Sequence, residues 1–470
     1  MVQSTKIQYA GEFNIKKCEL ITHSGNKFDL TQTLVEVNIY ENLMSNSINA
    51  NISFTDDKDA ITFFPIVGNE YVKLEIETPE STNSASINFR KHVFVVYKIL
   101  QKVDIQQASL ISLSLTTNEM FSNLRKRVSQ SYTGAYSEMV EKIFRDKNYL
   151  NSKKQLNLED TVGGHSLIVP NMHPFAAINM IAQRSFSKNN TSSYLFYETT
   201  KSYNFRTLES LFEQGSVFSF VVGEGGDYQD GKVNPMMANL HQVEKNEMIS
   251  NNDILTNTKL GIYSSKMIVH DIYNKNFSVK TFSYKDEFDK KVDIENLGGS
   301  KGHPLFPVNS ILDEDNNKIS DFSDANLTVQ STSADGNIFA TSTYPNHRTP
   351  YGKTNPKEDI LNRFSKIALL NNGVKHFLEV VGNTVLEVGQ IITLKIPKNQ
   401  THEKFYDEKL SGNYMITELH HFFSEGGDRK HRIGMTIVKD SIKDGYPDAL
   451  PKMPKGRGAT KKLWLIHERI

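Results

Sequence analysis

Short runs in which apolar and polar residues alternate dominate the first part of the chain and constrain its fold more than any other feature. Val35, Val37 and Ile39 alternate with Glu36 and Asn38. A period of two is expected for a β-strand that has one buried face and one polar face. Further strand-like runs lie at 48–54, 72–76, 92–100 and 108–115. Five short strands in succession predict an antiparallel sheet that curls into a barrel or a sandwich.

The pattern changes to helical spacing in the middle of the chain. Apolar residues recur every three or four positions within 134–149, which predicts an amphipathic helix. The segment 173–186 predicts a second helix, with Pro174 in the first turn, where a missing amide hydrogen costs little. A strand is predicted at 193–199, so this region is expected to be α+β.

Strands return late in the chain, after a long polar stretch. The stretch from about 290 to 355 is rich in Asn, Asp, Ser, Thr and Gly, and its length predicts an insertion or an extended arm. A helix capped by Asn355 and Pro356 is expected next. The remaining predicted strands lie at 259–284, 377–397, 411–424 and 431–440. The late strands predict a second barrel-like sheet.

These patterns together predict a β-rich α+β protein with two tube-like antiparallel β-barrel domains and smaller α+β regions. A chain of 470 residues is too long for one ordinary hydrophobic core. The expected ranges are 1–120 for the first barrel, 121–238 for the α+β middle domain, 239–289 with 372–440 for a discontinuous second barrel, 290–371 for an insertion with a helix, and 441–470 for a C-terminal extension.

Charge and composition argue against several classes of function. Lys and Arg number 54 and Asp and Glu also number 54, so no excess of positive charge gathers DNA phosphates. No secretory signal pattern and no run of 18 uncharged apolar residues occurs, so a soluble chain without membrane insertion is expected. Cys18 is the only cysteine, and we interpret it as a buried or incidental thiol rather than a nucleophile.

One segment of the polar stretch has the spacing of a calcium-binding loop. Asp313, Asp315 and Asn317 occupy its positions one, three and five, and hard cations favour oxygen ligands from alternate residues. Lys318 stands where the sharp turn of such a loop needs glycine, and Asp324 stands in place of the closing glutamate. The match to a calcium loop is therefore weak, and no cofactor is predicted.

Histidines and carboxylates elsewhere do not combine into a metal or catalytic site. His165 and His173 lie on either side of a proline, without a cysteine or carboxylate at ligand spacing. His420 and His421 are adjacent on a predicted strand and point to opposite faces, so they do not chelate one ion together. HEKFYDE at 402–408 offers acid–base groups, but a polar hairpin tip explains it equally well. No nucleophile elbow, zinc-binding helix or phosphate loop is present, so the chain is predicted not to be an enzyme.

The C-terminal extension combines a basic, proline- and glycine-containing segment with an apolar end. Seven Lys or Arg stand against three Asp or Glu from 441 onward. The apolar end consists of Leu463, Trp464, Leu465 and Ile466, and it contains the only tryptophan of the chain. We interpret this end as a partner-binding anchor on a neighbouring subunit or another protein. The alternative is a tail that packs on its own last barrel.

Three blocks occur in a particular order along the chain. They are NLMSNSINANISFTDDKDAITFFPIVGNEYVKLEI, HPFAAINMIAQRSFSKNNTSSYLFYETTKSYNFRTLESL, and FLEVVGNTVLEVGQIITLKIP with SGNYMITELHHFF. In this succession the chain resembles the baseplate hub protein of contractile-tailed, T-even-type bacteriophages, a family similar to the hub part of type VI secretion spike proteins. The resemblance covers roughly 30–120, 170–215 and 375–440, whereas the 290–355 stretch and the C-terminal extension depart from it.

The resemblance implies a structural protein of the virion tail baseplate, synthesised in the host cytoplasm. Three copies would form a homotrimeric ring with pseudo-sixfold symmetry, connecting the hexameric tail tube to the trimeric central spike. The implied partners are the tail tube protein, the central spike protein and the wedge proteins of the baseplate, and DNA would pass through during ejection without specific binding. The alternatives are a β-rich receptor- or carbohydrate-binding tail protein and a cell-wall hydrolase, for which no catalytic constellation is recognised.

Overall fold

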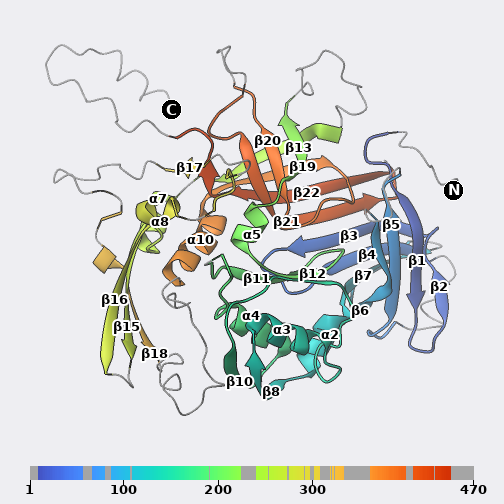
Figure 1. Ribbon diagram of the computed structural model, residues 1–470. Coiled ribbons are helices and arrows are strands. Elements are labelled where there is room, and N and C mark those ends of the chain that lie inside the picture. Colours follow the sequence, from blue (N-terminus) through green and yellow to red (C-terminus); the bar gives the residue numbers. More distant parts are fainter. Residues whose placement is uncertain are drawn as a thin grey trace.

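The computed structural model shows a strand-rich chain built around one large sheet (Figure 1). The structure describes residues 9–56, 66–79, 86–105, 108–189, 191–223, 240–251, 253–271, 275–290, 292–296, 301–306, 318, 320–321, 323–332, 360–398, 406–427 and 429–445. Within these residues, one sheet has thirteen strands and four smaller sheets have two or three strands each.

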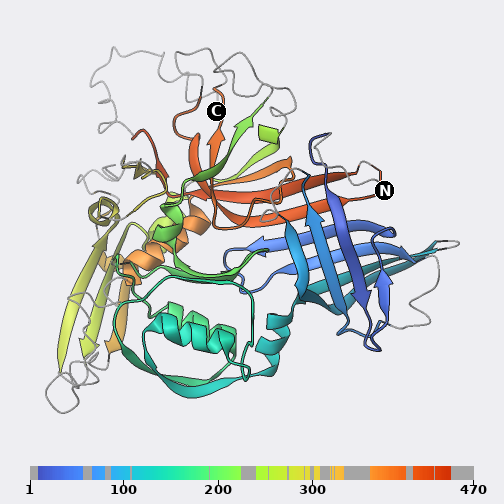
Figure 2. The same cartoon turned by 45° about the vertical axis from the view of Figure 1, so that its right-hand side comes forward.

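The first half of the large sheet is a curved, fully antiparallel sheet from the N-terminal part of the chain (Figure 2). Its strands are β1 (Asn14–Ile21), β2 (Lys27–Asp29), β3 (Leu34–Asn42), β4 (Asn49–Asp56), β5 (Tyr71–Glu77), β6 (Ile87–Ile105) and β7 (Ala108–Thr117), in the order β2-β1-β5-β6-β7-β4-β3. The alternation predicted at 72–76 is confirmed, because Val72, Leu74 and Ile76 are fully buried. They pack in a cluster of apolar side chains that this half of the sheet encloses.

The second half of the large sheet closes into a six-stranded barrel. Its strands are β13 (Ser216–Val222), β14 (Gln242–Ser250), β19 (Val374–Val381), β20 (Ile391–Lys395), β21 (Gly412–Ser424) and β22 (Lys430–Lys439). They follow the order β21-β20-β13-β14-β19-β22, and β22 pairs again with β21 to close the ring. Even an eight-stranded barrel has an interior only wide enough for side chains, so a six-stranded barrel is filled and has no bore of its own.

The two halves are joined edge to edge by β3 and β21. Residues 36–42 of β3 pair antiparallel with 418–424 of β21. Phe423 belongs to a barrel strand, yet its side chain packs in the cluster of the first half, edge-on to Phe13 at 5.2 Å between ring centroids. The barrel and the first half therefore share both a hydrogen-bonded ladder and a buried contact.

The predicted strand-rich α+β fold class is confirmed, with two differences in detail. β13 pairs in parallel with β14 and with β20, whereas an entirely antiparallel barrel was expected. Among the described residues, the ladder of the first half runs from β2 to β3 and continues into β21 without closing on itself. A parallel pair needs a long crossover, and the chain supplies one because 168 residues lie between Val222 at the end of β13 and Ile391 at the start of β20.

A middle region packs small sheets against helices around its own apolar cluster. It contains α2 (Asn118–Arg125), β8 (Val128–Gly134), α3 (Tyr136–Arg145), β9 (Leu156–Leu158), β10 (His165–Met172), α4 (Pro174–Ala182), β11 (Tyr194–Glu198), β12 (Tyr203–Thr207) and α5 (Leu208–Phe212). The helices predicted within 134–149 and 173–186 are confirmed, and Pro174 stands in the first turn of α4 as expected. β13 lies inside the 121–238 range expected for this region, but it hydrogen-bonds to barrel strands.

A three-stranded sheet projects from the barrel side of the molecule, and we call it the arm (Figure 1). Its strands are β15 (Ser264–Asp271), β16 (Asn276–Ser283) and β18 (Leu327–Thr332), in the order β16-β15-β18. Short elements surround its root: α7 (Ile254–Lys259), α8 (Tyr284–Phe288), β17 (His303–Pro304), η3 (Ser323–Ala325), α10 (Ile360–Asn372) and β23 (Ser441–Ile442). β15 and β16 fall in the range expected for the second barrel, yet they pair with β18 instead.

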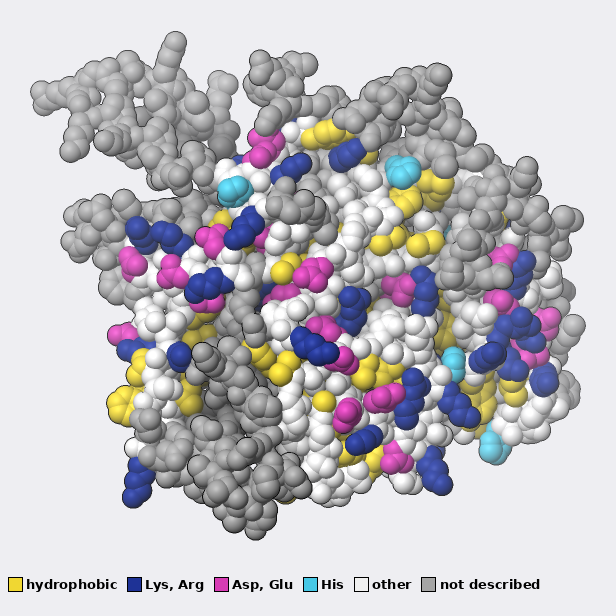
Figure 3. All heavy atoms as spheres, in the orientation of Figure 1, with side chains coloured by type: hydrophobic (Ala, Val, Ile, Leu, Met, Phe, Trp, Pro, Cys, Tyr) yellow, Lys and Arg dark blue, Asp and Glu magenta, His cyan; other side chains and the backbone are white. Residues whose placement is uncertain are grey.

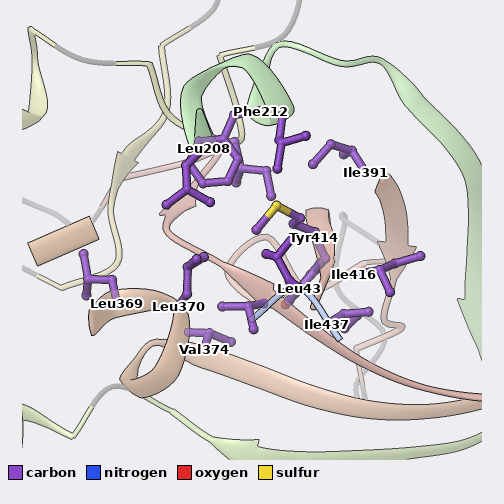
Figure 4. Packing of buried hydrophobic residues seen from close by; sticks show 14 of the residues in the cluster. Leu43, Leu208, Phe212, Leu369, Leu370, Val374, Ile391, Tyr414, Ile416 and Ile437 are labelled. Carbon is purple, nitrogen blue, oxygen red and sulfur yellow. The ribbon is translucent and has the colours of Figure 1, made fainter. Parts of the chain in front are cut away.

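The largest apolar cluster lies where the barrel, α5 and α10 meet. Figure 4 shows Leu208 and Phe212 of α5 and Leu369 of α10 packed toward barrel residues such as Tyr414. We propose a division of the chain by its three buried clusters: the first half of the large sheet, the middle region, and the barrel with the root of the arm. The residues expected to cap α10, Asn355 and Pro356, lie outside the described residues.

We expect Phe423→Ala to lower the free energy of unfolding by about 3–5 kcal/mol, because it removes a buried ring at the contact between the two halves. Urea unfolding followed by circular dichroism measures the change. Phe422→Ala is the matched control, since the neighbouring ring is only partly buried and its loss should cost less. Equal losses for the two variants would contradict the assigned role of Phe423.

Candidate functional site

A single buried carboxylate on β3 contacts all three parts of the molecule. Glu41 is 2% exposed and continues the inward-facing series that includes Val37 and Ile39. Its Oε1 accepts a hydrogen bond of 2.9 Å from the backbone N–H of Thr200, between β11 and β12. Its Oε2 accepts one of 3.0 Å from the backbone N–H of Val388, which precedes β20. The side chain thus ties the first half, the middle region and the barrel together.

The turn that presents Val388 to Glu41 depends on a glycine. Gly389 has φ of +83°, a left-handed conformation that glycine adopts without strain. A Cβ at this position would lie 2.6 Å from the Tyr197 hydroxyl oxygen. The Gly389 N–H donates to the carbonyl of Ile416 on β21, which holds the turn against the barrel.

Burial raises the pKa of Glu41 from its ordinary value of 4.5 to about 8, and the nearby Glu387 carboxylate acts in the same direction. The two backbone N–H donors oppose this rise because they stabilise the charged form. Lys201 forms an ion pair with Glu387 beside this site. The charge state of Glu41 therefore changes close to neutral pH, at the point where the three parts meet.

A second buried group of charges holds the middle region against the first half. Lys154 donates from Nζ to Glu119 at 2.9 Å and to Glu198 at 2.5 Å. The other oxygen of Glu198 accepts hydrogen bonds from the backbone N–H of Ile48 at 3.0 Å and from the Thr117 hydroxyl at 2.9 Å. Both of these donors lie at ends of strands of the first half. We call these residues, together with Glu41, the polar junction.

The electrostatics of the polar junction follow from its burial. Burial alone would lower the pKa of Lys154, but the adjacent carboxylates of Glu198 and Glu119 raise it. Burial also raises the pKa of Glu198 by more than Lys154 lowers it. The lysine is thus held as a cation between two carboxylates that water does not reach. Such a group orients the parts it joins and offers no access to a substrate.

In contrast to the buried polar junction, one edge of strand β6 is exposed to solvent. β5 pairs with β6 only as far as Val95, and among the described residues no strand pairs with the same side of β6 beyond Val96. This segment, 97–105, carries the exposed apolar side chains of Tyr97, Ile99, Leu100 and Val103. We call it the β6 edge. An unpaired edge with apolar side chains is a template for pairing with another chain.

Of the residues in the weak calcium match, only Lys318 and Asp324 lie within the described part of the chain. Asp313, Asp315 and Asn317 lie outside the described residues. Asp324 pairs with Lys266 of the arm at 2.7 Å. Within the described ranges, no three His, Cys, Asp or Glu side chains group as metal ligands.

The histidines considered as ligands have other partners. His165 stacks on Tyr136 at 4.0 Å, and His173 contacts the carbonyl of Asn123 through Nδ1 at 2.9 Å. His420 contacts Asn38 at 2.7 Å, while His421 faces the interior and lies 3.1 Å from His431, measured between ring nitrogens. Burial lowers the pKa of His421 to about 3, so the inner pair is neutral at ordinary pH.

The remaining candidate groups have structural environments or lie outside the described residues. Burial raises the pKa of Cys18 to about 12, which keeps its thiol protonated and unreactive. In 402–408, the residues up to 405 lie outside the described part, and Asp407 accepts from the backbone N–H groups of Lys409 and Leu410. The predicted anchor residues Leu463, Trp464, Leu465 and Ile466 also lie outside the described part. No helix that the structure describes is long and apolar enough to cross a membrane.

Glu41, Glu119, Lys154 and Glu198 are the buried charged residues of the polar junction, and none of them was predicted from the sequence. The signal for Glu41 was present, because the alternation that places Val37 and Ile39 inside also places residue 41 inside. No comparable signal marks Lys154, since it lies in a loop and its two carboxylate partners are 35 and 44 residues away in sequence.

Comparison with known proteins identifies the fold. No protein-family model matches the chain, and no curated protein matches its sequence. The structure is similar to a tail protein from Neisseria meningitidis MC58, with a TM-score of 0.50 and 9% identity over 93% of this chain and 99% of that one. It is also similar to the 43 kDa tail protein of prophage MuSo2 from Shewanella oneidensis, with a TM-score of 0.50 and 8% identity over 91% of this chain and 99% of that one. The resemblance to tail proteins predicted from the sequence is confirmed at the level of the fold.

We expect Lys154→Met to lower the free energy of unfolding by about 3–5 kcal/mol, because it leaves two buried carboxylates without their cation. Lys188→Met is the matched control. It removes a 2.9 Å ion pair to Asp160 whose side chains are 71% and 69% exposed, and it should cost no more than about 1 kcal/mol. Chemical denaturation measures both, and similar losses would refute the importance of the buried group.

The stability of the wild type relative to Glu41→Gln should fall as pH rises from about 4.5 to about 8. In this window the folded chain keeps the Glu41 proton and the unfolded chain releases it, so rising pH favours unfolding by up to ~1.4 kcal/mol per pH unit. Denaturant titrations of both proteins between pH 5 and 8 measure the difference. Parallel pH curves would show that Glu41 is ionised in the folded chain throughout.

Proposed function

We propose that this chain is a structural subunit of a phage tail baseplate, namely the hub between the tail tube and the central spike. The observation that carries the proposal is the shared fold, which extends over 93% of this chain and 99% of a solved tail protein. The large sheet has two curved halves per chain, and three chains would therefore place six such halves around the axis of a ring.

The proposed assembly is a homotrimeric ring with pseudo-sixfold symmetry, to which each chain contributes the first half and the barrel. Most soluble oligomers have closed symmetry, and a ring removes strand edges that would otherwise pair without limit. Because the six-stranded barrel is filled by side chains, the passage for DNA lies between copies of the chain. A formal net charge of zero is compatible with DNA passing without tight binding.

The β6 edge is the surface proposed to contact a neighbouring copy. Figure 2 shows the hairpin of β6 and β7 extending outward from the first half. Lys98 and Lys102 on this segment are charges of the kind that limit uncontrolled edge pairing in the free protein. The further partners proposed are the tail tube protein, the central spike protein and the wedge proteins.

The role proposed for the chain is structural and non-enzymatic. The polar junction is buried among parts of the fold, and the cavity beside Tyr284, Lys366 and Asp440 has a volume of about 20 Å³. Such a cavity holds about one water molecule and not a substrate. The proposed location is the baseplate of the virion tail, after synthesis in the host cytoplasm.

Light scattering after size exclusion tests the ring. The expected mass is three times 53.4 kDa, about 160 kDa, for the chain alone, and this value plus the mass of the bound spike when a spike candidate is coexpressed. A monomer in both samples would contradict the trimer and favour a receptor-binding role.

Tyr97→Glu combined with Leu100→Glu tests the contact surface. The double variant should raise the midpoint of trimer formation at least about tenfold in concentration, because it places charges at a contact that becomes dry. Leu124→Glu, at an apolar side chain on α2 that is 58% exposed, is the control and should assemble like the wild type. A normal trimer in the double variant would exclude the β6 edge without excluding the ring.

A further inference from the structure

One face of the arm carries exposed apolar side chains from neighbouring strands. The register places Val279, Ile268 and Val329 side by side across the three strands, with Leu327 in the next row beside Lys266. Val329 is 66% exposed, Leu327 51% and Val279 45%. Figure 3 shows hydrophobic side chains gathered on the arm at the lower left. We call these four apolar residues the arm face.

The opposite face of the same sheet explains why the arm keeps its orientation. Met267, Val269 and Phe282 point to that side, where they are buried in the largest apolar cluster. Alternate residues of a strand face opposite sides, so burying one set presents the other to solvent. The arm face is therefore held outward by the packing beneath it.

The size of the arm face limits what can cover it. Three strands at a spacing of about 4.8 Å make a surface only about 10 Å wide. A stable contact between two folded proteins buries roughly 800 Å² on each partner, several times more than this surface offers. A short segment of extended chain fits better, because four residues span about 13 Å.

The C-terminal part of the chain supplies a segment of the right length and character. Leu463, Trp464, Leu465 and Ile466 form an apolar run of four residues in a mainly basic extension, four residues before Ile470. Two lysines, 461 and 462, precede this run. At the rim of the arm face, Asp324 is 78% exposed and pairs with Lys266 at 2.7 Å, which leaves a carboxylate accessible to those lysines.

The described chain ends close to the root of the arm. β23 pairs with β17, and the carbonyls of Asp444 and Gly445 accept hydrogen bonds of 2.8 Å from Lys409. β17 follows α8, which begins directly after β16 of the arm. In Figure 1, β17 lies on the same side of the molecule as the arm. The chain thus leaves the described structure near the root of the arm.

We propose that residues 463–466 dock on the arm face of the same copy. Seventeen residues, 446–462, connect Gly445 to Leu463, and extended chain reaches about 3.5 Å per residue, so the connection spans up to ~60 Å. A tether of this length holds the apolar run at an effective concentration of about 1 mM, which favours the chain's own arm over that of a diluted second copy. This docking differs from the contact with a neighbouring subunit or another protein that was expected from the sequence, because it gives residues 463–466 a site on their own copy.

Trp464 is the only tryptophan of the chain, so its fluorescence reports docking without a label. We expect the full chain to show blue-shifted emission that iodide quenches weakly. Val279→Ser combined with Val329→Ser should shift the emission to the red and raise the iodide quenching constant several-fold. Val67→Ser combined with Ile168→Ser is the matched control, since both side chains are 75% exposed and lie on other elements. It should leave the spectrum unchanged.

A competing peptide tests the same contact without changing the arm. A synthetic peptide of residues 458–470 with Trp464→Phe is silent in tryptophan fluorescence and should displace the tail, which increases quenching. The proposal would be overturned if the arm-face variant and the wild type had the same emission maximum and the same iodide quenching constant. An emission maximum that changes with protein concentration would indicate that residues 463–466 dock on a second copy. That result would contradict docking on the same copy. The measurements use diluted protein, so they read docking whether or not the proposed ring forms.

Discussion

The ladder between β3 and β21 is the constraint on which the rest of the structure depends. It pairs residues 36–42 with 418–424, so segments at opposite ends of the chain become neighbours in one sheet. Closing so long a loop lowers the conformational entropy of the chain, and several contacts formed together are needed to offset that loss. The ladder is accompanied by such contacts, since Phe423 enters the core of the first half and Glu41 reaches the turn before β20. The ladder, Phe423 and Glu41 together join the two curved halves into one sheet.

The polar junction adds orientation to this framework. Buried ion pairs contribute little net stability because removing charges from water is costly, but an unpaired buried charge is worse. Lys154 therefore tolerates one arrangement, in which Glu119 and Glu198 both lie within hydrogen-bonding distance. Glu198 in turn needs the backbone N–H of Ile48, which belongs to the first half. The middle region is thus held in one position by the requirement that every buried charge has a partner.

The fold of this chain is similar to that of solved tail proteins at only 8–9% sequence identity. Sheets accept many apolar side chains at inward positions as long as alternation and register are kept. The contacts that differ between such proteins are expected at exposed places. In this chain those places are the β6 edge and the arm face, whose apolar side chains have no role in the buried clusters.

The sequence by itself determined the fold class, many of the strands and two helices of the middle region, α3 and α4. Alternation at 72–76 and helical spacing at 134–149 are local patterns, and a local pattern specifies which side of an element is buried. It does not specify the neighbour of an element, so the parallel pairing of β13 with β20 and the pairing of β15 with β18 appeared only in the tertiary structure. Glu41 shows the boundary between the two kinds of information: its inward position followed from alternation, but its donors at Thr200 and Val388 are 159 and 347 residues away. Residues so distant are brought together by the pairing of whole strands, and that is a property of the folded chain.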